Sequence, residues 1–214
     1  MPPITPAPQR RRGLLLAAGA ALVAMPALHL RVLAQTPARR LTPAQTEGPF
    51  YPVALPADSD ADLLANGALH YAQGQAAWVE GTVSDLDGRP VRGAAVEIWQ
   101  CDQQGHYHHP GDGDRADRAF QGFGRVAVDG EGRYRFRTIR PVAYGGRAPH
   151  IHVKVKLAAR ELLTTQLYVQ GDAGNARDFL WRNLRNDDDR AALTLAFTPA
   201  ADGLQARFPI VVAA

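Results

Sequence analysis

The chain has 214 residues, of which 46% are hydrophobic, and this length and composition suit one globular domain. Its net charge of +3 comes from the N-terminus, because residues 1–34 hold four arginines and no acid and leave 20 basic against 21 acidic residues in the remainder. A domain without net positive charge lacks the basic surface that binds a phosphate backbone, so no nucleic acid is expected as a partner.

The N-terminus is typical of an export signal. Arg10, Arg11 and Arg12 precede the apolar run 13–28, and Ala34 is a small residue at which a signal peptidase could cut. Paired arginines before such a run favour the twin-arginine route, which exports folded proteins. We therefore expect a signal peptide over 1–34, a periplasmic or extracellular location, and no stable membrane span after cleavage. The alternative is a retained anchor, although the apolar run is at the short limit of a span.

Residues 35–46 are polar and contain proline, and they predict an extended arm before a domain over 47–214. Many short strands at close spacing predict an all-β fold, an antiparallel β-sandwich. One short C-terminal helix is predicted over Asn175–Arg185, with Asp172 near its start. Cys101 is the single cysteine, so the core alone must hold the fold together. The predicted strands lie at 78–84, 94–100, 134–137, 150–157, 166–169 and 206–212.

The strand at 150–157 (HIHVKVKL) has the clearest alternation. Its apolar residues share one face, and His150 and His152 share the other face with two lysines. The two imidazoles would be about 6–7 Å apart along the strand, close enough for both to reach one metal ion. A lone H-x-H is more often a pair of polar residues on a solvated face, so the neighbouring residues decide the interpretation.

Two tyrosines lie in loops close to this strand. Tyr144 is in the turn Tyr-Gly-Gly-Arg just upstream, and Tyr107 is in a loop after strand 94–100. A phenolate is a hard, anionic donor and imidazole is intermediate, whereas zinc more often takes cysteine or carboxylate together with histidine. Two phenolates with two imidazoles therefore favour Fe(III).

The sequence resembles the intradiol ring-cleavage dioxygenases, such as the protocatechuate 3,4-dioxygenases and catechol 1,2-dioxygenases. The similarity runs over roughly residues 42–172, and all four ligand positions of the family are filled in order. The matching segments are TEGPFYP (46–52), DLDGRPVRGAAVEIWQCDQQGHYHH (85–109), FQGFGRVAVDGEGRYRFRTIRPVAY (120–144), RAPHIHVKV (147–155) and TQLYVQGD (165–172).

The resemblance implies that Fe(III) is bound by Tyr107, Tyr144, His150 and His152. It implies that Arg147 and Gln166 contact the substrate and stabilise its developing charge. It also implies a catechol-type substrate that binds through both oxygens, releases Tyr144 as a proton acceptor, and is cleaved with O2 between its two hydroxylated carbons. The product would be a cis,cis-muconate-type diacid, and the fold would be a β-sandwich.

Two departures from the family affect the pocket and the assembly. The loop from Tyr144 to His150 is short compared with the protocatechuate enzymes, which carry a Trp-containing insertion there. The chain also shows no long helical N-terminal region of the kind that catechol 1,2-dioxygenases use to dimerise. The substrate therefore stays open among catechol, protocatechuate, hydroxyquinol and larger catechols, and so does assembly into a homo-oligomer.

Two other functions compete with this one. Gly88–Ala94 and Asp129–Phe136 also resemble non-catalytic, prealbumin-like β-sandwich binding modules, in which such residues only form turns and strand starts. The combination of two tyrosines and two histidines favours the enzyme, since a binding module has no reason to keep them together. The remaining alternative, a zinc site, is less favoured because it lacks cysteine or acidic ligands at a clear spacing. Its histidines would be His70, His106, His108 and His109.

Three single residues and one acidic run are expected to be structural. We expect Trp78 and Trp99 to be core residues, and Glu97 to face solvent or an interface. The run 187–189 (DDD) is expected to be an exposed helix end and not a metal cluster.

Overall fold

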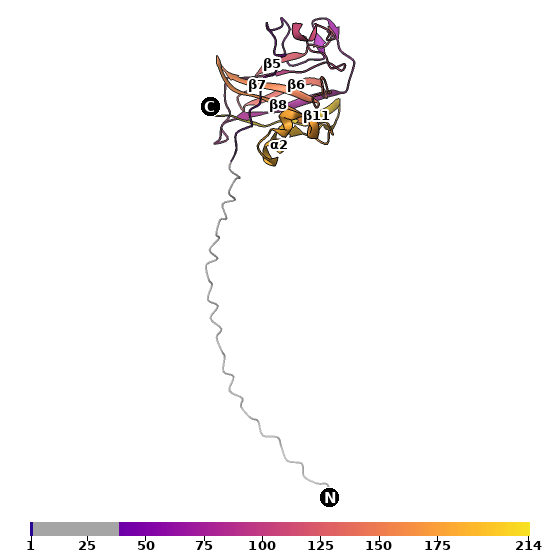
Figure 1. The fold of residues 1–214 in the computed structure, drawn as a ribbon. Helices are drawn as coiled ribbons and strands as arrows, with labels where there is room; N and C mark the ends of the chain where they lie inside the picture. Colours follow the sequence, from indigo (N-terminus) through magenta and orange to yellow (C-terminus); the bar gives the residue numbers. More distant parts are fainter. Residues whose placement is uncertain (2–38) are drawn as a thin grey trace. The chain divides into compact units, whose positions relative to one another are not determined.

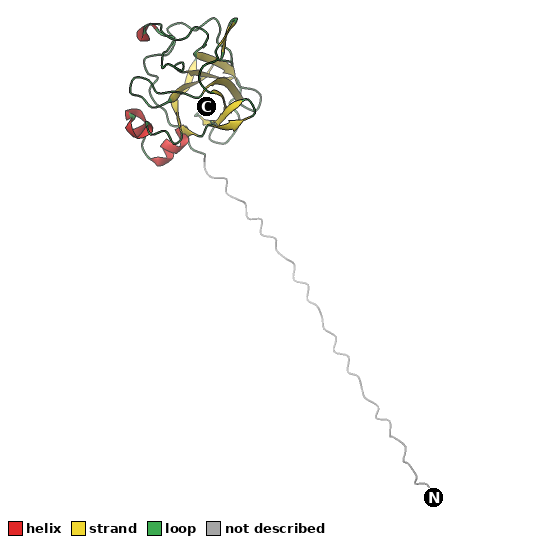
Figure 2. Ribbon diagram, turned by 90° about the vertical axis from the view of Figure 1, so that its right-hand side faces the viewer, coloured by secondary structure: helices red, strands yellow, loops and turns green. Residues whose placement is uncertain are grey.

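The computed structural model describes Met1 and residues 39–214, so the predicted signal peptide lies almost entirely outside the described residues. Residues 39–214 form a mostly β structure with short helices to one side, which confirms the predicted all-β class (Figures 1 and 2). Two five-stranded sheets enclose one apolar core. In the described part of the chain, no helix has the length and apolar character needed to cross a membrane.

The first sheet is built around β3 (Ala76–Ser84). This strand pairs antiparallel with β6 (Arg133–Ile139) on one side and parallel with β11 (Gly203–Arg207) and β12 (Ile210–Val211) on the other. β10 (Thr198–Ala200) completes the sheet beside β11. The predicted strand 206–212 is thus two strands, interrupted at Phe208 and Pro209. These parallel pairs make the sandwich mixed, whereas we expected it to be antiparallel throughout.

The second sheet has the order β5-β4-β7-β8-β9. Its four longer strands are antiparallel, and only β8 and β9 pair in parallel. The alternation predicted for β4 and β7 is confirmed, since Val96, Ile98, Ile151 and Val153 are buried in the core between the sheets. The bounds are β4 (Ala94–Trp99), β5 (Phe123–Ala127), β7 (His150–Leu157), β8 (Arg160–Val169) and β9 (Thr194–Leu195).

The outer face of the second sheet is also buried, although it is polar. Register places Trp99, His152 and Gln166 in one row across β4, β7 and β8, and Glu97 and Lys154 in the next. All five are at most 6% exposed. Polar groups can be buried only where they find partners, so something must cover this face and supply them.

An N-terminal strap, residues 42–51, provides part of that cover. Its backbone bonds to both sheets, since the Thr42 N–H donates to Val211 O and the Gln45 N–H donates to Thr164 O, each at 2.9 Å. The hydroxyl of Thr165 donates to Pro43 O at 2.7 Å. The described end of the predicted arm is therefore fixed against the domain, and the strap continues past it over the polar face.

The predicted helix Asn175–Arg185 is wrong in its extent. The structure has a 3-10 turn, η2 (Asn175–Arg177), then α1 (Phe179–Arg182) and a separate α2 (Asp187–Leu193). The N-cap of α1 is Asp178, in place of the expected Asp172, because the Asp178 carboxylate accepts from the Leu180 and Trp181 N–H groups. The run 187–189 begins α2, and Asp189 is buried against Arg40 instead of exposed.

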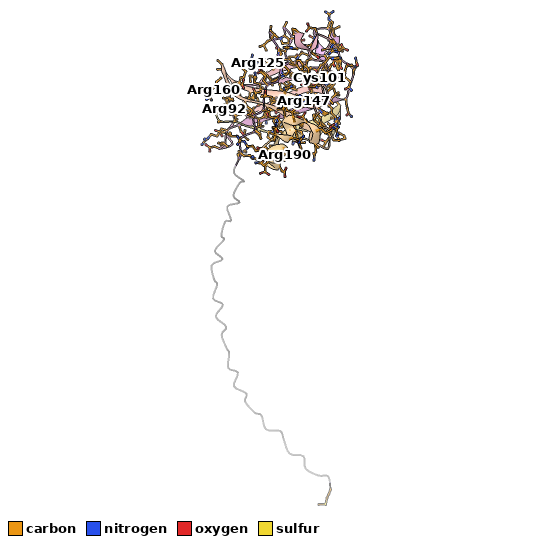
Figure 3. All side chains as sticks on the ribbon, in the orientation of Figure 1. Arg92, Cys101, Arg125, Arg147, Arg160 and Arg190 are labelled. Carbon is orange, nitrogen blue, oxygen red and sulfur yellow. The ribbon has the colours of Figure 1, made fainter. Side chains whose placement is uncertain are left out.

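The remaining elements lie in the loops. β1 (Ala65–Asn66) and β2 (Leu69–His70) form a small hairpin, and η1 (Pro110–Asp112) lies in the loop after β4. Cys101 at the start of that loop is free and buried (Figure 3). Burial raises the pKa of its thiol to about 12, so it stays protonated at neutral pH.

Candidate metal centre

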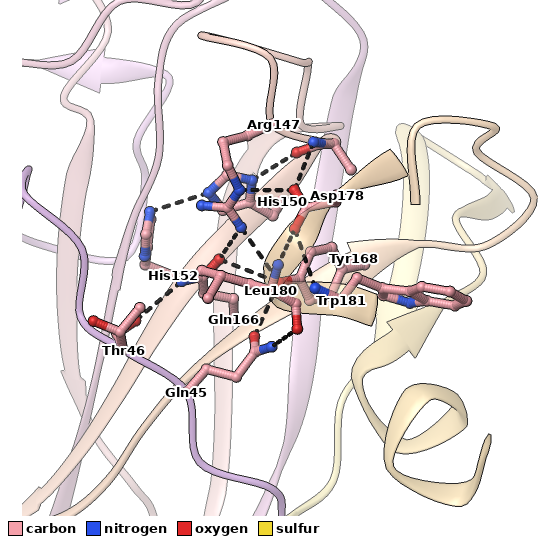
Figure 4. Close-up of polar contacts among 11 residues, drawn as sticks. Gln45, Thr46, Arg147, His150, His152, Gln166, Tyr168, Asp178, Leu180 and Trp181 are labelled. Carbon is pink, nitrogen blue, oxygen red and sulfur yellow. Dashed lines mark hydrogen bonds and ion pairs between the residues drawn. The ribbon is translucent and has the colours of Figure 1, made fainter. Parts of the chain in front are cut away.

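His150 and His152 project from the outer face of β7, as the alternation predicted. The Nε2 atoms of the two imidazoles are 3.2 Å apart. The Nδ1 atom of His150 lies 2.6 Å from Ala148 O, and because a carbonyl can only accept, Nδ1 must carry the proton. The lone pair of His150 is therefore on Nε2, directed at Nε2 of His152 (Figure 4).

The imidazole of His152 is held by stacking. It lies almost parallel to the Trp99 ring, with centroids 4.8 Å apart and an interplanar angle of 8°. Its Nδ1 atom is buried and has no hydrogen-bond partner. Burial holds the pKa of His150 at about 4 and that of His152 well below its usual range, so both rings are neutral at pH 7.

The two tyrosines come from separate loops and meet above these histidines. The Tyr107 ring centroid is 4.9 Å from that of Tyr144 and 6.0 Å from that of His152. Tyr144 in turn is 5.3 Å from His150. The structure thus brings together all four residues for which the sequence predicts metal binding.

A glycine turn places Tyr144. The Arg147 N–H donates to Tyr144 O at 2.7 Å, which folds the chain back directly before β7. Gly145 and Gly146 have φ of 51° and 79°, a left-handed conformation that side chains other than glycine rarely adopt. The turn expected at Tyr-Gly-Gly-Arg is therefore present, and it folds the chain back directly before β7.

The donor set fits a hard cation. Two nitrogens at a right angle and each about 2.1 Å from one ion would be about 3 Å apart, close to the observed 3.2 Å between the imidazoles. Tyr107 is 2% exposed, and its hydroxyl has no hydrogen-bond partner. Burial raises the pKa of both phenols, so they ionise at neutral pH only beside a strong positive charge. An Fe(III) ion would supply that charge and satisfy the orphaned hydroxyl.

No zinc cluster competes with this centre in the part of the chain that the structure describes. There, no group of three or more His, Cys, Asp or Glu side chains is arranged to hold a metal ion. The loop histidines have separate protein partners instead. His108 contacts Phe120 O at 2.5 Å, His109 accepts from the Gly111 N–H, and His106 lies 3.4 Å from Asp112.

Arg147 lies beside the histidines, where the sequence places it. Its Nε donates to Asp178 at 2.7 Å, and its Nη2 donates to Gln166 Oε1 at 2.7 Å and contacts the Tyr168 hydroxyl at 3.4 Å (Figure 4). Gln166 also donates from Nε2 to Thr46 O at 3.0 Å. Both ends of the Gln166 amide are therefore engaged by protein, and the residue links Arg147 to the strap.

Three residues that support the side chains of the metal centre were not identified from the sequence. Phe50 in the strap stacks on Tyr107 with ring centroids 4.7 Å apart, Trp99 supports His152, and Asp178 holds Arg147. The aromatic pair in TEGPFYP and the alternation of β4 offered weak signals for the first two. Nothing in the sequence pattern links Asp178 to a residue 31 positions earlier.

Two expectations about structural residues are wrong. Glu97 is fully buried, where its carboxylate accepts from the Tyr51 hydroxyl at 2.8 Å and lies 3.6 Å from Arg125. Trp78 is only half-buried and lies on the outside of the first sheet under Arg135, whose guanidinium is 3.6 Å from the ring centroid. Trp99, by contrast, is buried as expected, in a second apolar cluster with Tyr107 and Phe123 on the outer face of the second sheet.

Comparison with known proteins gives consistent matches. A family model described as "Dioxygenase" matches residues 46–212. Hydroxyquinol 1,2-dioxygenase from Corynebacterium glutamicum is 36% identical over 149 residues, covering 61% of this chain and 47% of that protein. Catechol 1,2-dioxygenase from Acinetobacter baylyi is 32% identical over 158 residues, covering 65% and 50%. The chain thus spans about half the length of the curated relatives it matches.

The fold also matches solved structures. The dioxygenase domain of a dioxygenase carbohydrate-binding protein fusion from the cellulolytic bacterium Streptomyces sp. SirexAA-E aligns with a TM-score of 0.61 at 30% identity. The alignment covers 80% of this chain and 97% of that domain.

Proposed function

The chain belongs to the intradiol dioxygenase family, and from that membership we propose that it is an Fe(III)-dependent enzyme that cleaves a catechol-type ring between its two hydroxylated carbons. O2 is the second substrate, and a cis,cis-muconate-type diacid is the product. The observation that carries the proposal is the convergence of Tyr107, Tyr144, His150 and His152, with an orphaned phenol and two facing Nε2 atoms.

These four residues would hold the iron. When bound, Fe(III) supplies Lewis-acid chemistry, drawing electron density from a catecholate so that a ring carbon becomes open to O2. The two tyrosines differ in accessibility, since Tyr107 is buried and Tyr144 is half-buried. The more accessible Tyr144 is the better placed of the two to leave on substrate binding and to accept a proton from a catechol hydroxyl.

Arg147 supplies fixed positive charge beside the reacting ring. It cannot bind a cation, and Asp178 and Gln166 hold its guanidinium in place. A preorganised cation of this kind stabilises negative charge that develops only as the ring is activated. Gln166 contributes by orienting Arg147, and its amide oxygen and nitrogen are already bonded within the protein.

An absorption spectrum with metal analysis and product analysis tests the function. Two phenolates on Fe(III) give charge-transfer absorption in the visible, so the iron-loaded protein should be red-brown. Catechol and O2 should yield a muconate-type diacid. A colourless protein with stoichiometric zinc would refute the iron centre and favour the non-catalytic binding module. The yellow semialdehyde of cleavage beside the diol would refute the mechanism, since it indicates Fe(II) with a facial triad of two histidines and a carboxylate.

The substrate class follows from the relatives. Proteins named hydroxyquinol and catechol 1,2-dioxygenases match at 36% and 32% identity, and a protocatechuate 3,4-dioxygenase beta chain matches at 40%, so we propose a single-ring catechol of this group. Specificity constants for catechol, hydroxyquinol and protocatechuate, measured side by side, test this assignment. Turnover of none of the three by the iron-loaded protein would contradict it.

Export through the twin-arginine route remains our proposal, supported by the arginines at 10–12. A fusion to a reporter that is active only outside the cytoplasm tests it, with Arg11→Lys and Arg12→Lys together as the control. Unchanged reporter activity in that double variant would contradict the route.

A further inference from the structure

Asp178 is the most heavily bonded carboxylate near the metal centre. It is 1% exposed and stands between η2 and α1, directly before Phe179. Its Oδ1 atom accepts from the Leu180 and Trp181 N–H groups at 2.9 and 3.1 Å. Its Oδ2 atom accepts from Arg147 Nε at 2.7 Å and from the Ala148 N–H at 2.8 Å. One oxygen therefore caps a helix, and the other binds Arg147 and Ala148 in the turn before β7.

The bond to Ala148 extends to the first histidine. The same residue whose N–H donates to Asp178 uses its carbonyl to accept from Nδ1 of His150 at 2.6 Å. That acceptance fixes the proton of His150 on Nδ1 and leaves the lone pair on Nε2, where the metal would bind. The two peptide units that flank Ala148 thus connect Asp178 to the tautomer of His150.

The other partners of Arg147 are neutral. Gln166 and Tyr168 contact its Nη2 atom. The ring centroid of Phe179, a residue that is 59% exposed, lies 5.4 Å from its Cζ atom. Among the residues that the structure describes, Asp178 is the acid paired with this guanidinium. Hydrogen bonds between charged groups are shorter and about twice as strong as neutral ones, so Asp178 sets the direction of Arg147.

We propose that Asp178 is a positioning residue of this centre: its carboxylate aims Arg147 at the reacting ring and fixes the backbone at Ala148, whose carbonyl holds His150. The proposal rests on the proposed function only for the part that concerns turnover. Its structural part, the orientation of Arg147, can be measured without any reaction. Because Asp178 is the N-cap of α1, the position of this helix brings a buried carboxylate to the start of β7.

The principal test is Asp178→Asn, with Asp189→Asn as the matched control. Asparagine still caps a helix but has no charge. Asp189 is also buried, also lies at the start of a helix and also pairs with an arginine, Arg40. Neither Asp189 nor Arg40 contacts any residue of the metal centre described above. We expect Asp178→Asn to keep its iron and visible colour and to lower kcat by about tenfold or more with little change in KM. Asp189→Asn should keep kcat within twofold.

Two further measurements separate positioning from simple structural support. In an Arg147→Ala background, Asp178→Asn should lower kcat by a much smaller factor than it does in the otherwise wild-type protein, because one of its two targets is already gone. In the metal-free protein, the Arg147 Nε–H signal in a 15N NMR spectrum should shift and exchange faster in Asp178→Asn and remain unchanged in Asp189→Asn. If Asp178→Asn does not fold, Asp178→Ser retains a capping oxygen and is used in its place.

The outcomes are distinct. Two results would overturn the proposal. One is a double variant whose kcat falls by the full product of the two single-variant reductions, and the other is an Arg147 Nε–H signal that does not change in Asp178→Asn. A wild-type protein that binds iron but cleaves no catechol would instead overturn the proposed function, and the NMR comparison would still decide whether Asp178 positions Arg147.

Discussion

The outer faces of the two sheets carry similar residues in opposite surroundings. On the first sheet, Glu80 contacts Arg135 and Arg207 at the surface, and both arginines are more than half exposed. On the second sheet, Glu97 and Lys154 are 0% and 6% exposed beneath the strap. Strands with the same alternation thus give a solvated face on one side of the sandwich and a buried polar face on the other.

This difference indicates where function resides. Exposed ion pairs contribute little to stability and need no partner, because water solvates them. Buried polar atoms must be bonded or serve a purpose, and at the second sheet His152 Nδ1 and the hydroxyl of the loop residue Tyr107 above it remain without a protein partner. What distinguishes the centre is that these two residues also meet Tyr144 and His150 there.

The largest effect should come from removing a metal ligand on the buried face. His152→Ala deletes a buried donor, so we expect loss of bound iron, of visible absorption and of all measurable ring cleavage. Iron content per chain and the visible spectrum measure this. His70→Ala, on the exposed hairpin strand β2, should retain all three, and equal iron in both variants would show that His152 is not a ligand.

The next effect should come from the cation beside that ligand. Arg147→Ala should keep iron and colour but lower kcat by about a hundredfold, which corresponds to about 3 kcal/mol, by analogy with removing an oxyanion donor. Arg135→Ala, which removes a guanidinium from the exposed face, should leave kcat within twofold. Loss of iron from Arg147→Ala would instead assign that residue a structural role.

A smaller effect is expected in stability. Tyr51→Phe removes the donor to Glu97 Oε2 and leaves a buried carboxylate oxygen short of a partner, at a cost of about 1–3 kcal/mol in the free energy of unfolding. Glu80→Gln on the exposed face should cost less than about 1 kcal/mol. Urea unfolding at pH 7 measures both, and similar costs would remove the distinction between the two faces.

The smallest effect concerns pH. Burial raises the pKa of the Asp178 carboxyl, but bonds from Arg147, Ala148 and Trp181 outweigh burial and leave the pKa below its usual range. A group with a lowered folded pKa stabilises the fold fully above its unfolded pKa, about 4, and this contribution is lost as the pH falls further. The unfolding free energy of Asp178→Asn should therefore fall less steeply below pH 4 than that of wild type. An unfolding free energy that falls equally steeply below pH 4 in both proteins would contradict the assignment.

Local patterns in the sequence predicted much of the fold. The alternation in 94–100 and 150–157 assigned core and outer faces correctly, and it placed His150 and His152 side by side. The turn before β7 was identified because glycine is needed there. These features depend on residues close together in the chain, and so they are visible in the sequence.

The errors arose from contacts between distant segments. Glu97 was expected to face solvent because its strand gives no sign that Tyr51, 46 positions earlier, would cover it. Asp178 was not identified for the same reason, since its pairing with Arg147 depends on where α1 docks. The predicted helix at 175–185 was too long because its apolar residues continue past the point where α1 ends. The structure has no helix between Asn183, the C-cap of α1, and Asn186, the N-cap of α2.

The strap also has a consequence for the order of folding. Thr42 exchanges hydrogen bonds with Val211, since its N–H donates to Val211 O and its hydroxyl accepts from the Val211 N–H, each at 2.9 Å. These partners are 169 positions apart, so the strap reaches its final place only after nearly the whole chain has left the ribosome. During synthesis the polar face of the second sheet therefore lacks this part of its cover until the last strands of the first sheet are in place.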